Sequence, residues 1–133
     1  MTQKISCDHP KIVEAINVAI ELASDSQVSE AIRILADLVA AYPGVASAHA
    51  YLGWFLSQIG QHVDAIDQCH IAVQLAPGSE KASLVYFHVL WRAGQQIEAL
   101  DEMKRFLVIG PSEEYSKIIH DWEPNIWNEQ EPE

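Results

Sequence analysis

The chain has 133 residues, of which 49% are hydrophobic and 20% are charged. This length suits one domain with a core of its own, and the balance is that of an ordinary globular protein. The formal net charge of -11 predicts repulsion from nucleic acid and anionic lipid, and attraction to a basic partner. A more general interpretation is that the charge keeps an extended surface soluble.

The beginning of the chain lacks the pattern of a targeting segment. Residues 1–10 contain Asp8 and no apolar stretch, unlike a signal peptide. No apolar run approaches the roughly 18 residues that a membrane span requires. The two cysteines, Cys7 and Cys69, indicate neither a disulfide framework nor a set of zinc ligands. We therefore expect a reduced, cytoplasmic setting, with no cofactor and no metal.

A period of 34 residues runs through the sequence. Prolines recur with this period at Pro43, Pro77 and Pro111. Alanines recur at Ala31, Ala65 and Ala99. Gly60 and Gly94 are one period apart, and Ser26 has the same phase one period earlier. Such a period in a helix-favouring sequence indicates an array of helix–turn–helix repeats.

The period divides the chain into three units that follow an N-terminal extension, 1–11. The units are 12–45, 46–79 and 80–112. Each unit holds two helices separated by a short polar break, at 24–27, 59–61 and 93–95. Glycine adopts the left-handed conformation that can end a first helix, and the prolines follow the second helix, which they cannot continue.

The second unit shows how the two helices of a pair should pack. Its first helix places Leu52, Gly53 and Leu56 on one face. The facing stripe of its second helix, with helical spacing, is Ala65, Ile66, Cys69, Ala72 and Val73. Small side chains in both stripes predict a close approach of the two helices. We interpret Cys69, in the middle of this contact, as a buried and unreactive thiol.

A further helix is predicted after the third unit. Ser112 followed by Glu113 and Glu114 is typical of a helix start. An apolar stripe then follows at Tyr115, Ile118, Ile119 and Trp122. This pattern predicts a capping helix over 113–122 that covers the open end of the array.

Two large rings predict what this helix packs against, and one proline predicts where it ends. Phe87 and Phe106 of the third unit should provide contact area for it. Pro124 should end it, leaving residues 123–133 as an acidic tail.

The repeat units resemble those of the tetratricopeptide repeat (TPR) family, whose pattern is W-x2-L-G-x2-Y, then A-x3-F, then P. The second unit matches this pattern at Leu52, Gly53, Ala65, Cys69 and Pro77. The third matches it at Tyr86, Phe87, Leu90, Ala99, Met103 and Pro111. The tryptophan position of the pattern instead holds Ala15, His49 and Ser83. The resemblance covers about residues 12–112 and implies an all-α fold, an α-solenoid of three TPR helical hairpins plus a C-terminal capping helix.

The resemblance also implies a binding groove, because the first helix of each repeat lines the concave side of a TPR array. Carried over by position, the groove residues of the first unit are Val13, Ile16 and Ile20. Those of the second unit are Ser47, Ala50, Trp54, Ser57 and Gln58. Those of the third unit are Lys81, Leu84, His88, Trp91 and Arg92.

Within this set, Trp54 and Trp91 are expected to be apolar anchors for a partner, since tryptophan is enriched among binding hot spots. The alternative is that each packs against a neighbouring repeat. Lys81, His88 and Arg92 are expected to form a positive cluster that could hold a carboxylate. The alternative is that they are only the solvated edge of a helix. A TPR subclass that grips the C-terminal carboxylate of a heat-shock chaperone is matched here only at Lys81.

These features predict a non-catalytic protein-binding module that captures an apolar or amphipathic partner segment. It would be an adaptor, scaffold or assembly factor. The alternatives are a chaperone like those of type III secretion translocators and an acidic inhibitor or immunity protein that masks a basic partner. Exposed Ile12, Val13 and Ile16 on the first helix could also support a homodimer.

An enzyme or a metal protein is the disfavoured alternative. The sequence has no GxSxG, no P-loop and no GxGxxG motif. Cys69 and His70 are adjacent and would point about 100° apart on a helix, so they cannot act together as nucleophile and base.

Overall fold

The computed structural model describes the backbone of residues 10–130 and the side chains of residues 10–122. Cys7 and most of the predicted N-terminal extension lie outside the described residues. Within this part, the chain forms seven α-helices and no strand. The helices are α1 (Pro10–Ser24), α2 (Val28–Ala41), α3 (Ala46–Gln58), α4 (His62–Leu75), α5 (Glu80–Arg92), α6 (Gln96–Ile109) and α7 (Glu113–Gln130).

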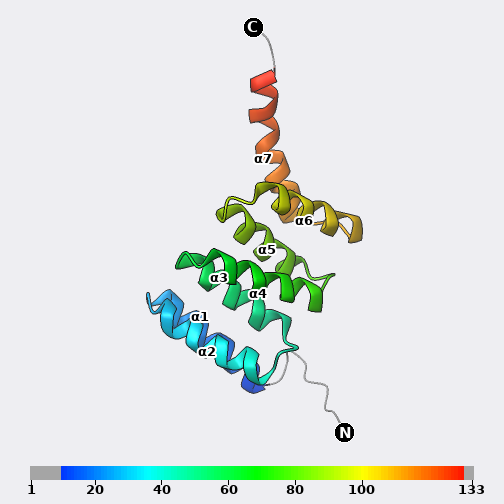
Figure 1. Ribbon diagram of the computed structural model, residues 1–133. Helices are drawn as coiled ribbons and strands as arrows, with labels where there is room; N and C mark the ends of the chain where they lie inside the picture. Colours follow the sequence, from blue (N-terminus) through cyan, green and yellow to red (C-terminus); the bar gives the residue numbers. More distant parts are fainter. Residues whose placement is uncertain (1–9, 131–133) are drawn as a thin grey trace.

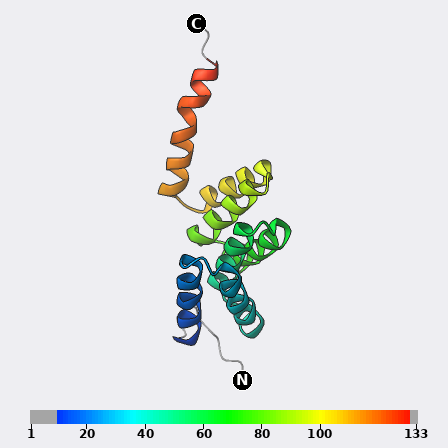
Figure 2. The same ribbon diagram turned by 90° about the vertical axis from the view of Figure 1, so that its left-hand side faces the viewer.

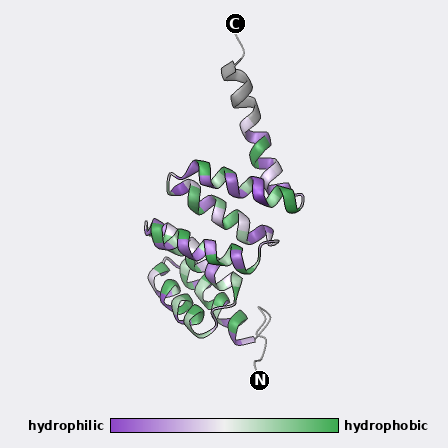
Figure 3. Ribbon diagram, turned by 45° about the vertical axis from the view of Figure 1, so that its right-hand side comes forward, coloured by the Kyte–Doolittle hydropathy of each residue, from purple (hydrophilic) through white to green (hydrophobic). Residues whose placement is uncertain are grey.

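The first six helices form three pairs that stack on one another, and α7 extends beyond the last pair (Figure 1). Hydrophobic and hydrophilic residues alternate along the stacked helices, as expected for helices that each bury one face (Figure 3). The predicted all-α solenoid with a C-terminal helix is therefore confirmed. Among residues 10–130, none of the helices combines the length and the hydrophobicity of a membrane span.

The turn inside each hairpin has the same backbone structure in all three repeats. A glutamine N–H donates to a leucine carbonyl five residues earlier, in the pairs Gln27–Leu22, Gln61–Leu56 and Gln95–Leu90. The residue before each glutamine has a positive φ, which is 65° at Ser26, 84° at Gly60 and 83° at Gly94. Glycine takes this left-handed conformation without steric cost, whereas serine does not. The 34-residue phase thus marks one recurring left-handed position.

Ser26→Gly is expected to stabilise the protein by about 0.5–1 kcal/mol. The substitution removes left-handed strain of about 1–2 kcal/mol, and glycine's freedom in the unfolded chain cancels about 0.4–1 kcal/mol of the gain. Urea unfolding followed by circular dichroism measures the difference. The reciprocal change, Gly60→Ser, should destabilise the protein by a similar amount, and a loss of stability in Ser26→Gly would contradict this explanation.

The contact between α3 and α4 is as close as the sequence predicts. A Cβ atom added to Gly53 would overlap the Sγ of Cys69 and lie 2.9 Å from the carbonyl oxygen of Ala65. Cys69 and Ala65 are fully buried, and Leu52 beside Gly53 is 4% exposed. The absence of a side chain at Gly53 therefore allows the two backbones to approach.

The first helix does not offer the apolar surface expected for a homodimer. Ile12 and Ile16 are 0% and 8% exposed and belong to the core with Leu35 of α2. Only Val13 of the three predicted residues is exposed. Ile12 and Ile16 are four residues apart and therefore share the face that α1 buries.

The start of α7 is anchored in the third hairpin. The Oγ of Ser112 accepts a hydrogen bond from the N–H of Tyr115 at 3.1 Å, which confirms the predicted helix start. The Tyr115 ring is fully buried, with centroids 5.5 Å from Phe87 and 6.1 Å from Phe106. Its hydroxyl forms a buried hydrogen bond of 2.7 Å with the Oγ of Ser83. Phe87 and Phe106 thus provide the contact area predicted for this helix.

A second aromatic contact holds the middle of α7. The Trp122 ring stacks on Trp91, with centroids 5.3 Å apart and planes at 24°. Trp91 also stacks on Phe87 at 5.8 Å. Ile118 and Ile119 pack against the same cluster. All four residues of the predicted apolar stripe therefore contact the third hairpin.

The predicted end of α7 at Pro124 is wrong. The helix continues to Gln130 and leads away from the stack (Figure 2). A proline inside a helix removes one hydrogen-bond donor and costs about 3 kcal/mol, which bends or weakens a helix without necessarily ending it. The backbone of most of the acidic tail is thus helical, while residues 131–133 lie outside the described part.

Candidate functional site: the groove between α3 and α5

The first helices of the second and third hairpins, α3 and α5, lie against each other and form a groove. It consists of two adjoining hollows that share Tyr51, Lys81 and Val85. The first hollow is about 420 Å³ and is lined by Gly44, Val45, Ala46, Ser47, Ala50, Tyr51, Ala76, Ser79, Lys81, Ala82 and Val85. The second is about 480 Å³ and is lined by Tyr51, Trp54, Glu80, Lys81, Leu84, Val85 and His88. We call these two hollows together the α3–α5 groove.

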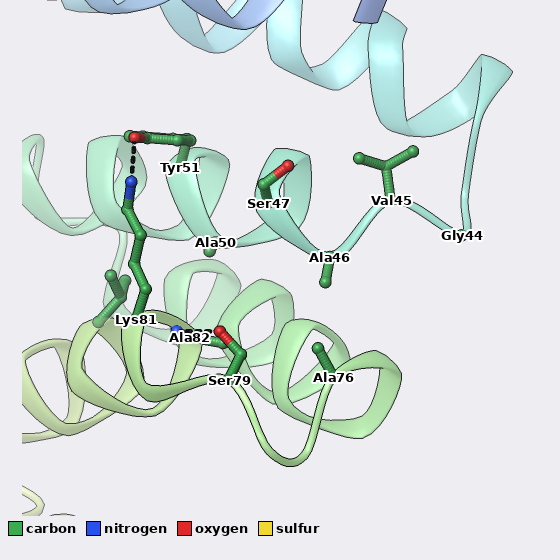
Figure 4. Close-up of a pocket in the computed structure, with 11 residues that line it drawn as sticks. Gly44, Val45, Ala46, Ser47, Ala50, Tyr51, Ala76, Ser79, Lys81 and Ala82 are labelled. Carbon is green, nitrogen blue, oxygen red and sulfur yellow. Dashed lines mark hydrogen bonds between the residues drawn. The ribbon is translucent and has the colours of Figure 1, made fainter. Parts of the chain in front are cut away.

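Lys81 and Tyr51 meet where the two hollows adjoin. The Nζ of Lys81, on α5, donates a hydrogen bond to the hydroxyl of Tyr51, on α3 (Figure 4). It also lies 4.6 Å from the centroid of the tyrosine ring. Lys81 lines both hollows and is exposed, so its charged head is accessible to a ligand in either one.

The first hollow is mostly apolar and has small side chains along its floor. Alanines from both helices and from the loop before α5 line it, and Ser79 caps α5 by accepting a hydrogen bond from the N–H of Ala82 at 3.1 Å (Figure 4). Small residues leave room for a guest side chain, and apolar walls favour its burial.

Trp54 provides the aromatic wall of the second hollow. Its side chain is partly buried and packs against the core. The guanidinium carbon of Arg92 lies 5.7 Å from the centroid of the indole, a cation–π contact across α3 and α5. Glu80, at the start of α5, adds one carboxylate to this hollow.

His88 does not contribute a positive charge to the groove at neutral pH. Burial lowers the pKa of its ring from 6.5, because desolvation disfavours the charged form. Lys81 and Arg92 lie near opposite ends of α5, about 16 Å apart along the helix, so the predicted positive cluster is two separate cations with a neutral imidazole between them in the sequence.

The His88 ring is expected to titrate with a midpoint below pH 6.5. Between the folded and unfolded pKa values the folded state binds fewer protons than the unfolded state. The free energy of unfolding contributed by His88 should therefore fall as the pH drops below about 6.5 and be constant above it. NMR titration of the imidazole resonances, assigned with His88→Gln, measures the midpoint. A midpoint at or above 6.5 would contradict desolvation as the dominant effect.

No protein-family model matches the sequence, and no curated protein matches it. Among solved structures, the second TPR of Spaghetti (RPAP3) bound to the HSP90 peptide SRMEEVD has a TM-score of 0.65. That match is 18% identical and covers 72% of this chain and 89% of the other. A point mutant of MamA has a TM-score of 0.65 at 21% identity, covering 79% and 77% of the two chains. A structure of MamA AMB-1 has a TM-score of 0.63 at 25% identity, covering 84% and 61%.

The chain has the tetratricopeptide repeat fold. In TPR terms, α1, α3 and α5 are the first helices of the three repeats, and α2, α4 and α6 are the second helices. The α3–α5 groove is thus formed by the helices that the resemblance assigned to the concave side.

Six of the predicted TPR groove residues line the two hollows. They are Ser47, Ala50, Trp54, Lys81, Leu84 and His88. Arg92 adjoins them through Trp54. Sequence reasoning missed Tyr51 and Val85, which lie one 34-residue period apart and face the groove from equivalent positions of α3 and α5. That shared phase is the signal that could have found them.

The remaining predicted positions lie elsewhere in the TPR fold. Ile16 and Ser57 are buried, Ile20 packs against the core, and Val13 and Gln58 are exposed but line neither hollow. No residue of the first repeat's α1 lines either hollow, so the described groove belongs to the second and third repeats.

Trp91 is placed differently from the prediction that it anchors a partner. Its indole is stacked between Phe87 and Trp122 and lines neither of the two hollows. The reason is that Trp122, in the part of α7 next to the third hairpin, stacks on the Trp91 ring. Trp54 is therefore the one predicted anchor that lines the α3–α5 groove, and Trp91 does not.

Cys69 is a structural residue of the TPR core. It is fully buried, and burial raises the pKa of its thiol to about 12. Near neutral pH, only a negligible fraction of Cys69 is therefore in the deprotonated, reactive thiolate form. The prediction of a buried, unreactive thiol is confirmed.

Proposed function

We propose that this chain is a non-catalytic protein-binding module that captures a partner segment in the α3–α5 groove. The observation that carries the proposal is the groove itself, an apolar cleft with Trp54 on one wall and a lysine head at its middle. Supporting it, the Spaghetti TPR of the same fold is bound to a peptide. The groove volume is in the range of sites that hold a few side chains of a ligand.

The groove chemistry favours an amphipathic guest. Apolar guest side chains would contact Ala50, Leu84 and Val85, with Trp54 as an aromatic anchor. Lys81 and Arg92 would pair with acidic groups beside them. An adaptor or a chaperone that shelters a segment would bind mainly through these buried contacts, and its affinity would change modestly with salt. An inhibitor that masks a basic partner with its acidic surface would lose affinity steeply with salt.

Peptides selected from a random phage library provide the ligands for the test. We expect the selected peptides to share an apolar core with adjacent acidic residues. Val85→Asp, which places a carboxylate in both hollows, should weaken their binding at least about tenfold, because the charge must be buried against the guest. Fluorescence anisotropy with labelled peptides measures the affinity, and circular dichroism checks that the variant is folded.

Ile97→Asp is the matched control. Ile97 is 73% exposed on α6 and lines neither hollow, so the same charge there should leave the affinity unchanged. If Val85→Asp and Ile97→Asp bound the selected peptides equally well, the α3–α5 groove would not be the binding site.

A further inference from the structure

The α3–α5 groove does not share the strong excess of negative charge of the whole chain. Lys81 and Arg92 border it, and neither forms an ion pair with Asp or Glu among the side chains of residues 10–122. Their described contacts are with the rings of Tyr51 and Trp54. Glu80 is the one carboxylate among the groove-lining residues. The lining of the groove thus holds one cation and one anion, with Arg92 beside it on Trp54, while the whole chain has a net charge of -11.

The acidic tail has the complementary composition. Residues 123–133 read EPNIWNEQEPE, with four glutamates and no lysine or arginine. Ile126 and Trp127 are adjacent in the middle of this segment. It therefore combines a large apolar pair with negative charge, which is the ligand chemistry that the groove favours.

The path of α7 leads the acidic tail away from the groove of its own chain. The contacts of Tyr115 and Trp122 fix the first part of the helix on the third hairpin. From there α7 extends away from the stack, and its 18 residues correspond to about 27 Å (Figures 1 and 2). To reach its own α3–α5 groove, the tail would have to unwind α7. The groove of a second molecule can receive it without that cost.

We infer that the α3–α5 groove binds the acidic tail, residues 123–133, of a second copy of this chain. The inference rests on the proposed function and specifies one partner for the same groove. Ile126 and Trp127 enter the apolar hollows, and the neighbouring glutamates pair with Lys81 and Arg92. The contact is head-to-tail, because the groove of one molecule receives the tail of the next, so chains can add one after another.

The first test is the mass of the full chain in solution. Sedimentation of the wild type should show a mean mass that rises with concentration above the monomer mass of 14.8 kDa. A groove variant, Val85→Asp, and a tail variant, Ile126→Asp with Trp127→Asp, should each remain monomeric at ten times the concentration at which the wild type associates. Ile97→Asp should associate like the wild type. Lys81→Glu serves as a second groove variant if circular dichroism shows that Val85→Asp is unfolded.

Mixing the two variants tests the head-to-tail geometry. The tail variant still has an intact groove, and the groove variant still has an intact tail. An equimolar mixture should therefore form a dimer of twice the monomer mass and nothing larger. A symmetric interface that uses one surface on both copies would not recover association in the mixture, and this result would overturn the inference.

A labelled peptide of residues 123–133 gives a direct binding measurement. It should bind the tail variant, whose groove is free, and lose at least tenfold in affinity for Val85→Asp, while a scrambled peptide should not bind. A monomeric wild type together with no binding of this peptide would overturn self-association. If the phage-selected peptides still bound the groove, the proposed peptide capture would stand without self-association. If those peptides also failed to bind the groove, peptide capture and self-association would both be contradicted.

Discussion

Gly53→Ala is expected to lower the free energy of unfolding by about 1–2 kcal/mol. The new Cβ would overlap the Sγ of Cys69 and lie 2.9 Å from the backbone oxygen of Ala65, so the two helices must move apart. Forcing a methyl group into a close-packed core costs about 1–3 kcal/mol or more, and the better helix propensity of alanine returns only about 1 kcal/mol. Because α3 and α4 form the middle hairpin, both neighbouring hairpins depend on this spacing. Urea unfolding measures the loss.

Gly78→Ala is the matched control for this prediction. Nothing lies within 4 Å of a Cβ at Gly78, and its φ is not in the left-handed region, so the change should be within about 0.5 kcal/mol. Adding Cys69→Ala to Gly53→Ala should restore part of the stability, because it removes the Sγ overlap but leaves the Ala65 oxygen in place. Equal stability of Gly53→Ala and Gly78→Ala would contradict the close contact.

Tyr115→Ala is expected to lower the free energy of unfolding by about 4 kcal/mol and to release α7. The ring is fully buried between Phe87 and Phe106, so truncation leaves a large cavity in the contact that holds the helix. Urea unfolding gives the stability. Limited proteolysis reports α7, which should become cleavable while the first six helices remain protected.

Tyr115→Phe separates the ring from its hydroxyl. It retains the aromatic packing but leaves the Oγ of Ser83 without its partner at a fully buried position, which costs about 1–2 kcal/mol. Replacing both partners, with Ser83→Ala added, should recover part of this loss. If Tyr115→Ala were no more destabilising than Tyr115→Phe, the ring packing would contribute little and the anchor of α7 would lie elsewhere.

The sequence predicted the hairpins and the middle core because both follow from local periodicity. A 34-residue repeat fixes where each helix turns, and the small stripe around Gly53 permits only a close pairing with α4. The contact between α7 and the third hairpin could also be predicted. A hydroxyl cap followed by an apolar stripe indicates a helix with one buried face, and the two large rings of the third unit can cover that face. These features depend on neighbours within one or two hairpins.

The groove was harder to predict because it depends on how whole hairpins are rotated against one another. Tyr51 and Val85 were missed, although their common phase places them on equivalent helix faces. Trp91 was assigned to the groove because the sequence does not show that Trp122 of the following helix stacks on its ring. Ile16 was assigned there because the family position was applied to a helix that buries this face against α2.

The stacked indoles of Trp91 and Trp122 have an optical consequence. Two such chromophores with centroids 5.3 Å apart couple their strong electronic transitions, which adds a positive and a negative band to the far-ultraviolet circular dichroism. One ring comes from the third hairpin and the other from the last helix, so this signal vanishes when the helix detaches, even if every hairpin stays intact. The wild-type chain therefore carries an intrinsic reporter of one joint, readable without an attached dye.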